Sequence, residues 1–249
     1  MQRLTGLDAA FLALETPSAH MHVMGVAVVD PSTVPDQQYD SFHERVRALL
    51  EERLALVPPL RRRLVEVPFG LNVPTWIDDP DFDLDYHLRR AALPAPGGPQ
   101  ELAAFAADVA SRPLDRRKPL WEAYVVEGLE HGYQAFVSKI HHSLIDGVAG
   151  IAILAALFDL ASDAPLEPQE QPDEWEPDHV PSDAEMVGRA LLAVAQRPAK
   201  MARAVVNSVP GLVRAVRRAR DEELDVALPL TAPRLSMNRT ITSHRVIAF

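Results

Sequence analysis

Two adjacent histidines, His141 and His142, open the run HHSLIDG, which carries the clearest chemical potential in the chain. One imidazole nitrogen can take a proton from a substrate hydroxyl while a hydrogen bond holds the other nitrogen. Asp146 lies four residues after His142 and could accept such a bond, or pair with an arginine and fix the loop. The pattern indicates general-base chemistry, with His142 as the base.

Two other uses of these residues are less favoured. Neighbouring side chains in a strand point to opposite faces, so His141 and His142 could share a metal only beyond the strand end. The chain has no cysteine and no H-E-x-x-H spacing. Ser143 lacks the flanking glycines of a nucleophile elbow. Direct attack by a bound alcohol on an activated acyl group is therefore favoured over a serine intermediate, and packed or solvated histidines are the structural alternative.

The elements around this run are predicted to hold the histidines at a strand end. Residues 121–129 and 133–142 are typical of two strands joined by a turn at Glu130–Gly132, an antiparallel hairpin. A helix is predicted from about Val148 to Leu160. Gly147, between strand and helix, allows a backbone shape that a side chain would obstruct.

Upstream, the sequence alternates between strand and helix patterns. A buried strand is predicted at 20–30, and apolar residues at helical spacing predict a helix within 39–54, ended by Pro58 and Pro59. Short strands are predicted near 64–67 and 74–77, and a helix at 100–111. The mixture indicates an α/β fold with a mixed sheet flanked by helices.

The composition limits the function classes. The net charge of −10 argues against general nucleic-acid binding, and the absence of cysteine fits a cytoplasmic protein without proving it. The N-terminus lacks the features of a signal peptide. The longest nearly uncharged stretch, VAGIAILAALFDLA, has 14 residues; a membrane span needs roughly 20.

Four segments follow from the charge and proline pattern. We expect a lobe at 1–161, an acidic proline-rich linker at 162–183, a basic amphipathic helical segment at 184–227, and a terminal strand within 228–249. Met186 to Arg220 contains eight Lys or Arg and no Asp or Glu. This make-up suits either an interfacial helix at a membrane or lipid-droplet surface, or a helical crossover packed on the acidic body.

HHSLIDG resembles the HHxxxDG motif of the superfamily that contains chloramphenicol acetyltransferase, carnitine acyltransferases and peptide-synthetase condensation domains. The opening RLTGLDAAFLALETPSAHMHVMGV, the run PLWEAYVVEGL and the block KIHHSLIDGVAG are similar to one branch of it, the bacterial wax ester synthase/diacylglycerol acyltransferases. The resemblance covers the whole chain and corresponds to the first half of the family's pattern. The second half, with an Asn-Asp motif, has no counterpart here.

The resemblance implies a chloramphenicol acetyltransferase-like lobe and an acyl-CoA-dependent O-acyltransferase. His142 would deprotonate a diacylglycerol or long-chain alcohol, His141 would support it, Asp146 would be mainly structural and Gly147 would aid substrate access. Acyl-CoA would be a substrate, with no cofactor or metal, and the family's C-terminal half would be a partner. A condensation-type or polyketide-tailoring acyltransferase and a non-catalytic lipid-surface module are the alternatives.

Several other residues have structural interpretations beside functional ones. His20 and His22 share a strand face and could lie near the site, although core or edge histidines are the simpler interpretation. Arg61–Arg63 could contact coenzyme A phosphates or form a solvated cluster. Trp76 and Trp121 are interpreted as core aromatics, and Pro119–Trp121 as packing beside the site.

Overall fold

The computed structural model describes residues 1–33, 41–145, 157, 177–195 and 241–249. One unit comprises Met1–Glu66, Val73–Val180 and Thr242–Phe249, and a second comprises Val67–Asn72 and Pro181–Ile241. The predicted helix at 148–160 lies outside the described residues apart from Leu157, as do most of the predicted linker and most of the basic segment.

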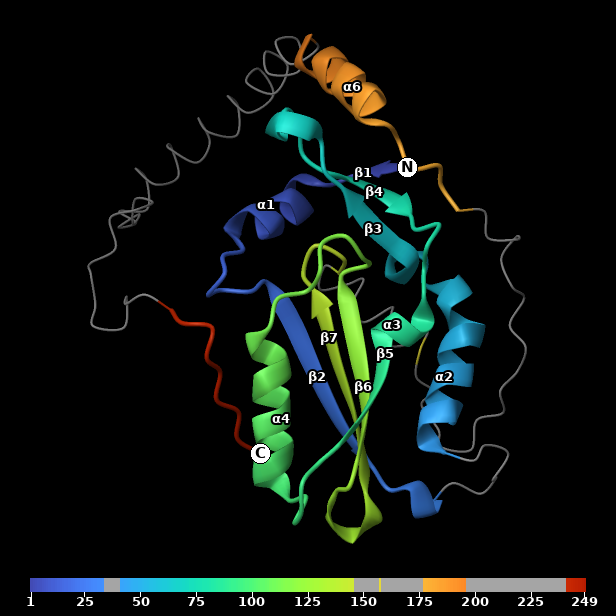
Figure 1. The fold of residues 1–249 in the computed structure, drawn as a ribbon, viewed down its shortest axis with the longest axis vertical. Helices are drawn as coiled ribbons and strands as arrows, with labels where there is room; N and C mark the ends of the chain where they lie inside the picture. Colours follow the sequence, from blue (N-terminus) through green and yellow to red (C-terminus); the bar gives the residue numbers. More distant parts are fainter. Residues whose placement is uncertain (34–40, 146–156, 158–176, 196–240) are drawn as a thin grey trace, which may run out of the picture. The chain divides into compact units, whose positions relative to one another are not determined.

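The first unit is built on a four-stranded sheet in the order β2-β7-β6-β5 (Figure 1). Its strands are β2 (His22–Val29), β5 (Leu88–Ala92), β6 (Trp121–Glu127) and β7 (Gln134–His141). β7 pairs antiparallel with both β2 and β6, whereas β5 pairs parallel with β6. The predicted strand at 20–30 and the predicted hairpin are confirmed. β5 was not predicted as a strand.

The hairpin turn occupies Glu130–Gly132, as predicted. His131 and Gly132 both have positive φ angles, 60° and 75°, a conformation that glycine adopts readily and other residues seldom. From the turn, β7 alternates strictly between partly buried and buried side chains until it ends at His141. This alternation sends one row of β7 side chains toward helix α4 (Pro99–Ser111).

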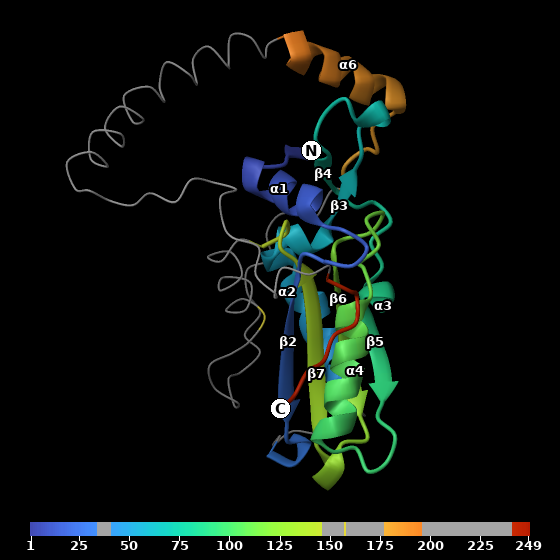
Figure 2. The same ribbon diagram turned by 90° about the vertical axis from the view of Figure 1, so that its left-hand side faces the viewer.

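Helix α4 covers one face of the sheet, as Figure 2 shows. Pro99 occupies its first turn, where a missing N–H costs nothing, and the Glu101 side chain accepts the Gly98 N–H at 2.9 Å. Its buried side chains, Leu102 and Val109 among them, pack with apolar residues of the central strands: Tyr124, Val126, Ala135 and Val137. The helix predicted at 100–111 is confirmed.

A larger core joins the sheet to the N-terminal elements. It includes residues of α1 (Gly6–Leu14), α2 (Phe42–Arg53), the 3₁₀ turns Leu54–Leu56 and Pro58–Arg61, and the short helix α3 (Leu84–His87). Thr5 and Asp8 form a capping box at the start of α1. The helix within 39–54 is confirmed as α2. Helix α1 was not predicted.

A small second sheet has the order β1-β4-β3 and is antiparallel throughout. Its strands are β1 (Gln2–Arg3), β3 (Arg62–Val65) and β4 (Thr75–Asp78), so both short strands predicted here are confirmed. The 3₁₀ turn Pro31–Thr33 follows β2. The result is a mixed α/β fold, as the sequence indicates.

The C-terminal residues differ from expectation. No strand is assigned to residues 241–249, although SHRVIAF was expected to form one. Residues 242–249 run beside α4 in Figures 1 and 2, and a groove of about 710 Å³ is lined by this segment and by α4. A helix offers no free strand edge for pairing, which explains the difference.

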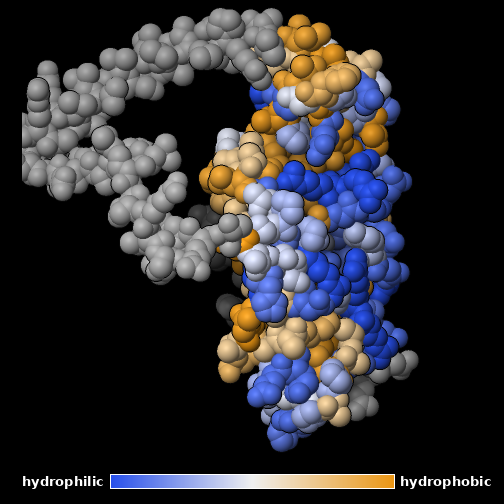
Figure 3. All heavy atoms as spheres, turned by 60° about the vertical axis from the view of Figure 1, so that its left-hand side comes forward, coloured by the Kyte–Doolittle hydropathy of each residue, from blue (hydrophilic) through white to orange (hydrophobic). Residues whose placement is uncertain are grey.

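In the second unit, the described residues form the 3₁₀ turn Pro68–Gly70 and α6 (Asp183–Ala195). Met186 and Ala190, one helical turn apart, are buried, whereas Leu191 and Leu192 are exposed. Figure 3 shows apolar surface gathered over α6. The start of the predicted basic segment is therefore helical and amphipathic.

Candidate active site

The two histidines of HHSLIDG lie where β7 ends, and they have different surroundings. His141 is the last residue of β7, pairs opposite His22 of β2, and is only 1% exposed. His142 lies beyond the strand and is partly buried, and its N–H donates to the Met21 carbonyl at 2.8 Å. Among the described residues the two imidazoles therefore contact different groups.

The ring of His142 is held by stacking. It lies against Phe11 of α1, with ring centroids 4.8 Å apart and an interplanar angle of 15°. Within residues 1–33 and 41–145, no side-chain hydrogen bond to this ring is found. Both ring nitrogens are therefore available, from this part of the chain, to a substrate or to residues that follow. Asp146 and Gly147 lie outside the described residues, so their predicted roles stay predictions.

His141 is instead enclosed by protein polar groups. Its Nδ1 lies 3.0 Å from the Ser143 backbone nitrogen and 2.7 Å from the Ser143 hydroxyl. Its Nε2 faces the Glu15 carboxylate at 3.7 Å. A buried imidazole with polar groups on both sides is well suited to support a neighbouring residue, and the described residues leave only 1% of His141 exposed.

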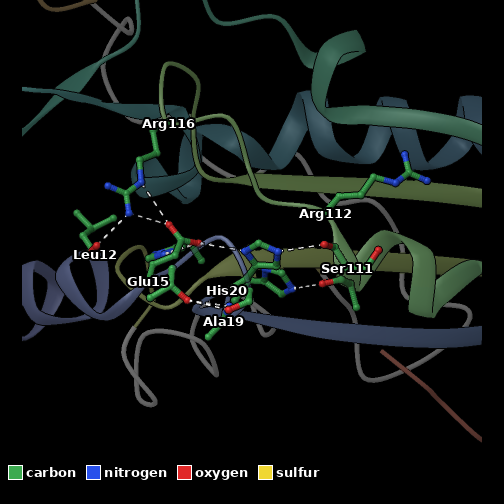
Figure 4. Close-up of polar contacts among 12 residues, drawn as sticks. Leu12, Glu15, Ala19, His20, Ser111, Arg112 and Arg116 are labelled. Atoms are coloured by element: carbon green, nitrogen blue, oxygen red, sulfur yellow. Dashed lines mark hydrogen bonds and ion pairs between the residues drawn. The ribbon is translucent and has the colours of Figure 1, made fainter. Parts of the chain in front are cut away.

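Glu15 lies between Arg116 and His20 in Figure 4, and its carboxylate also faces His141. Arg116 donates to Glu15 Oε2 through two nitrogens, at 2.8 and 3.3 Å, and to the Leu12 carbonyl at 2.9 Å. Burial would raise the pKa of Glu15, but contacts with His141 and Arg116 outweigh it and lower the pKa to about 2. Glu15 is therefore a fixed negative charge beside the first histidine.

The end of α4 is bound by side chains from β2, β7 and the residues before β2. His20 Nε2 lies 3.0 Å from the Ser111 carbonyl, and His22 Nε2 lies 3.0 Å from that of Ala110. Helix C-terminal carbonyls lack intrahelical partners, so the two imidazoles satisfy acceptors that would otherwise be orphaned. Burial, together with the nearby charges of Lys139 and His20, lowers the pKa of His22 to about 4.

Lys139, two residues before His141 on the same strand face, is fully buried. Its Nζ donates to the Val109 and Arg112 carbonyls at 2.9 and 3.0 Å and pairs with Glu122 at 2.5 Å. Burial lowers the pKa of Lys139, although the Glu122 carboxylate opposes the shift. The pairing of β2 with β7 thus brings His22, and with it His20, close to His141. His20 and His22 act as structural hydrogen-bonding groups at the end of α4.

The run Pro119–Trp121 packs directly beside the histidines. The His141 N–H donates to the Leu120 carbonyl at 2.9 Å. Trp121 Nε1 donates to the Leu60 carbonyl at 2.7 Å, and its ring stacks on the buried His87 with centroids 4.6 Å apart. Trp76 and Trp121 are both buried, which confirms the interpretation as core aromatics.

The arginine run at 61–63 is largely engaged in structural pairs. Arg62 pairs with Asp78 at 3.1 Å, and Arg63 pairs with the buried Asp79 at 2.9 Å. Burial lowers the pKa of Arg61. The β3–β4 pairing places these arginines beside acids of the neighbouring strand, which favours the structural interpretation over phosphate binding.

One cavity of about 180 Å³ touches the histidine run. Ser143 and Leu144 line it together with Thr5, Leu7 and Arg62. The larger groove along α4 is not lined by residues of the run. The smaller cavity therefore adjoins the two residues that follow His142, whereas neither His141 nor His142 lines it.

Sequence reasoning missed Phe11, Glu15 and Arg116. Phe11 lies in α1 and Glu15 follows it, and the short sequence of this helix gives only a weak helical pattern. Arg116 belongs to the basic run RRK, which is typical of solvent-exposed residues. The separation of Glu15 and Arg116 by 101 residues leaves no local signal. Only the tertiary fold brings them to His141.

Neither a metal-binding cluster nor a membrane-spanning helix is found within residues 1–33, 41–145, 157, 177–195 and 241–249. No group of three or more His, Asp or Glu side chains there is arranged to hold a metal ion. Among the same residues, no helix has the length and apolar character needed to cross a membrane.

Comparison with known proteins identifies the family. The sequence model of the wax ester synthase/diacylglycerol acyltransferase catalytic domain matches residues 4–249. A Mycobacterium tuberculosis protein named as a diacylglycerol O-acyltransferase is 42% identical over 202 residues, 81% of this chain and 42% of its own. Another, tgs3, is 37% identical over 250 residues, 98% of this chain and 89% of its own.

Structural comparison agrees. The wax ester synthase/diacylglycerol acyltransferase from Marinobacter aquaeolei VT8 matches 98% of this chain and 51% of its own, with 27% sequence identity and a TM-score of 0.59. The chain thus spans about half the length of some of these relatives and most of the length of tgs3. It belongs to the wax ester synthase/diacylglycerol acyltransferase family.

Proposed function

We propose that the protein transfers a long-chain fatty acyl group from acyl-CoA to the hydroxyl of diacylglycerol or of a long-chain alcohol. The observation that carries the proposal is the setting of His142: a partly buried imidazole at a strand end, stacked on Phe11, with no ring hydrogen bond from residues 1–33 and 41–145. The names of the relatives supply the substrate classes.

In the proposed reaction, His142 takes the proton of the acceptor hydroxyl as the oxygen attacks the thioester carbonyl. The carbon–oxygen bond forms, the tetrahedral intermediate collapses, and the carbon–sulfur bond breaks. The proton on His142 then passes to the departing coenzyme A thiolate. A thioester is already activated, so the proposal requires no metal and no cofactor.

Direct transfer is favoured over an acyl-enzyme because Ser143 is buried and contacts His141, the more buried of the two histidines. Its hydroxyl lies 2.7 Å from His141 Nδ1, and the residue is 4% exposed. A serine paired with a histidine is the usual arrangement of a nucleophile. Here, however, both side chains are buried, whereas the more open His142 has no contact with that hydroxyl among the described residues.

The partners are part of the proposal. We propose that the C-terminal part that longer relatives carry completes the substrate path. We also propose that the enzyme is cytoplasmic and that the amphipathic start of its basic segment contacts a membrane or lipid-droplet surface. The exposed Leu191 and Leu192 of α6 support the second point. Co-sedimentation with anionic and with neutral vesicles tests it, because attraction by the cations should favour the anionic ones and weaken with salt.

The test is a substrate panel with this chain alone and with the C-terminal part of a longer family member supplied. Long-chain acyl-CoA is offered with diacylglycerol, with a long-chain alcohol, and with neither, while product and free coenzyme A are measured. Ester formation with either acceptor is expected. Transfer only from carrier-bound acyl groups would favour a condensation-type or polyketide-tailoring enzyme. Vesicle binding without turnover in every combination would favour a non-catalytic lipid-surface module.

A further inference from the structure

Glu15 is the junction of a partly buried polar cluster made of Glu15, His20, Arg116, His141 and Ser143. Its side chain is 12% exposed, and its two oxygens have separate roles. Oε2 accepts from Arg116, whereas Oε1 faces His141 Nε2 at 3.7 Å and His20 Nδ1 at 4.0 Å. Figure 4 shows Glu15 between Arg116 on one side and His20 on the other.

The contacts of His141 define its tautomer. A backbone N–H can only donate, and that of Ser143 points at Nδ1 from 3.0 Å. Nδ1 must therefore carry the lone pair, so the proton of the neutral ring resides on Nε2. Nε2 faces Glu15 Oε1 at 3.7 Å, beyond hydrogen-bond distance, and has no hydrogen-bond partner among the described residues. A carboxylate stabilises an N–H pointed at it, so Glu15 favours this tautomer.

The bond between the Ser143 N–H and His141 Nδ1 also affects the position of His142, the proposed base. The Ser143 amide is the second peptide after His141 and the first after His142, so the bond to Nδ1 closes a tight turn around His142. At the other end of this turn, the His142 N–H donates to the Met21 carbonyl and the His141 N–H donates to the Leu120 carbonyl. Losing the Nδ1 acceptor would release the Ser143 N–H and loosen the turn, while the Leu144 N–H would still donate to the His141 carbonyl at 3.0 Å.

We propose that Glu15, its charge held by Arg116, is a positioning residue that fixes His141 in the Nε2–H tautomer and through Ser143 fixes the turn that presents His142. The consequence for turnover rests on the proposed acyl transfer. The consequence for the His141 tautomer does not, and it can be measured in protein without substrate.

Glu15→Gln tests this assignment because of Arg116. Charge-assisted donation from the guanidinium will retain the amide oxygen on the Arg116 side. The amide NH₂ then faces His141, where two donors oppose each other. His141 is expected to move its proton to Nδ1, which removes the acceptor of the Ser143 N–H. The variant therefore conserves the shape of the side chain at position 15, and it replaces the acceptor that faces His141 Nε2 with a donor.

Glu15→Gln combined with Arg116→Met provides a rescue. Without the guanidinium, the amide oxygen of the substituted side chain can turn toward His141 and accept from Nε2, which restores the original tautomer. Glu51→Gln is the matched control, since Glu51 is half exposed and pairs with Arg47 on the surface of α2. It should change neither the tautomer nor turnover.

The experiment is ¹⁵N NMR of histidine-labelled protein at a pH where the His141 ring is neutral, with the signals assigned from a His141→Gln spectrum. Wild type and Glu51→Gln should show a protonated Nε2. Glu15→Gln should show a protonated Nδ1 and faster amide exchange at Ser143, and the double variant should return toward wild type. A parallel assay should show kcat reduced about tenfold to a hundredfold in Glu15→Gln, with KM for acyl-CoA within about twofold.

A protonated Nδ1 in wild type overturns the proposal, as does a Glu15→Gln protein that keeps Nε2 protonated and turns over normally. Failure of the double variant to recover overturns the part assigned to Arg116. If the tautomer responds as expected while wild type transfers no acyl group in any substrate combination, the positioning role of Glu15 toward His141 stands and the proposed function fails.

Discussion

The Phe11 ring lies flat against the His142 ring, with centroids 4.8 Å apart and planes inclined by 15°. This contact joins α1 to the turn after β7, two segments separated by most of the first unit's sequence. A general base needs its nitrogen aimed at the hydroxyl, and stacking restricts the ring to one plane without occupying either nitrogen. Helix α1 therefore has a direct part in presenting His142.

Replacing Phe11 with alanine is expected to reduce kcat by about tenfold, because the His142 ring gains rotational freedom and is less often aligned for proton transfer. KM for acyl-CoA should change little if Phe11 acts through orientation. Steady-state kinetics with long-chain acyl-CoA measure both parameters. Leu14→Ala, on the same helix and at a position that is 61% exposed, is the control and should behave as wild type. A reduction confined to KM would contradict the orienting role.

Ser143→Ala distinguishes direct transfer from an acyl-enzyme. In the proposed mechanism the hydroxyl only bonds to His141 Nδ1, and the backbone N–H remains to do so, so kcat should fall by less than about tenfold. A serine nucleophile would make the loss about a thousandfold or more. Intact-mass spectra after a short reaction with acyl-CoA should show no acylated protein. An acyl adduct that disappears in Ser143→Ala would contradict direct transfer.

The buried Lys139–Glu122 pair is expected to be important for stability. Lys139→Met leaves Glu122 and the Val109 and Arg112 carbonyls without their donor, at a cost of about 3–5 kcal/mol. Arg90→Met, which removes a surface pair with Glu127, should cost less than about 1 kcal/mol. Urea unfolding of both variants provides the comparison. Equal losses would contradict the importance assigned to burial.

The pH dependence of stability should reflect His87. Burial, together with nearby Lys118 and Arg89 but opposed by a hydrogen bond to Trp121, lowers the pKa of His87 from 6.5 to about 4. The unfolded state then binds more protons between these values, so stability is full above about pH 6.5 and falls toward pH 4. The group accounts for up to about 3 kcal/mol of that loss.

His87→Gln should flatten this part of the profile, although it will also lower stability at neutral pH because stacking with Trp121 is lost. His179→Gln, at an exposed position, should leave the slope unchanged. Urea unfolding from pH 7 to pH 4 gives the slopes. An unchanged slope in His87→Gln would show that other groups set the acid sensitivity.

The sequence was sufficient for those parts of the fold whose patterns are local. The hairpin that carries His141, the strand at His20 and His22, and helices α2 and α4 all have a clear hydrophobic period or a turn signal. Even the position of His22 near the motif follows from strand pairing. The motif itself places His142 just past a strand end.

The surroundings of the histidines could not be read in the same way. Helix α1 is short, and β5 ends at Ala92 whereas its parallel partner β6 begins only at Trp121, so neither has a strong local pattern. Glu15, Arg116 and Phe11 reach the site through tertiary packing alone. The contacts that bind Lys139, His20 and His22 to the end of α4 depend on where that helix ends in space.

The most direct test of the account is the turnover of His142→Ala against wild type, with His141→Ala in parallel, on long-chain acyl-CoA and an acceptor alcohol. Circular dichroism first establishes that each variant is folded. If His142 is the general base, its removal should reduce kcat by about a hundredfold to ten-thousandfold at little change in KM. His142→Ala turning over at the wild-type rate would contradict the account.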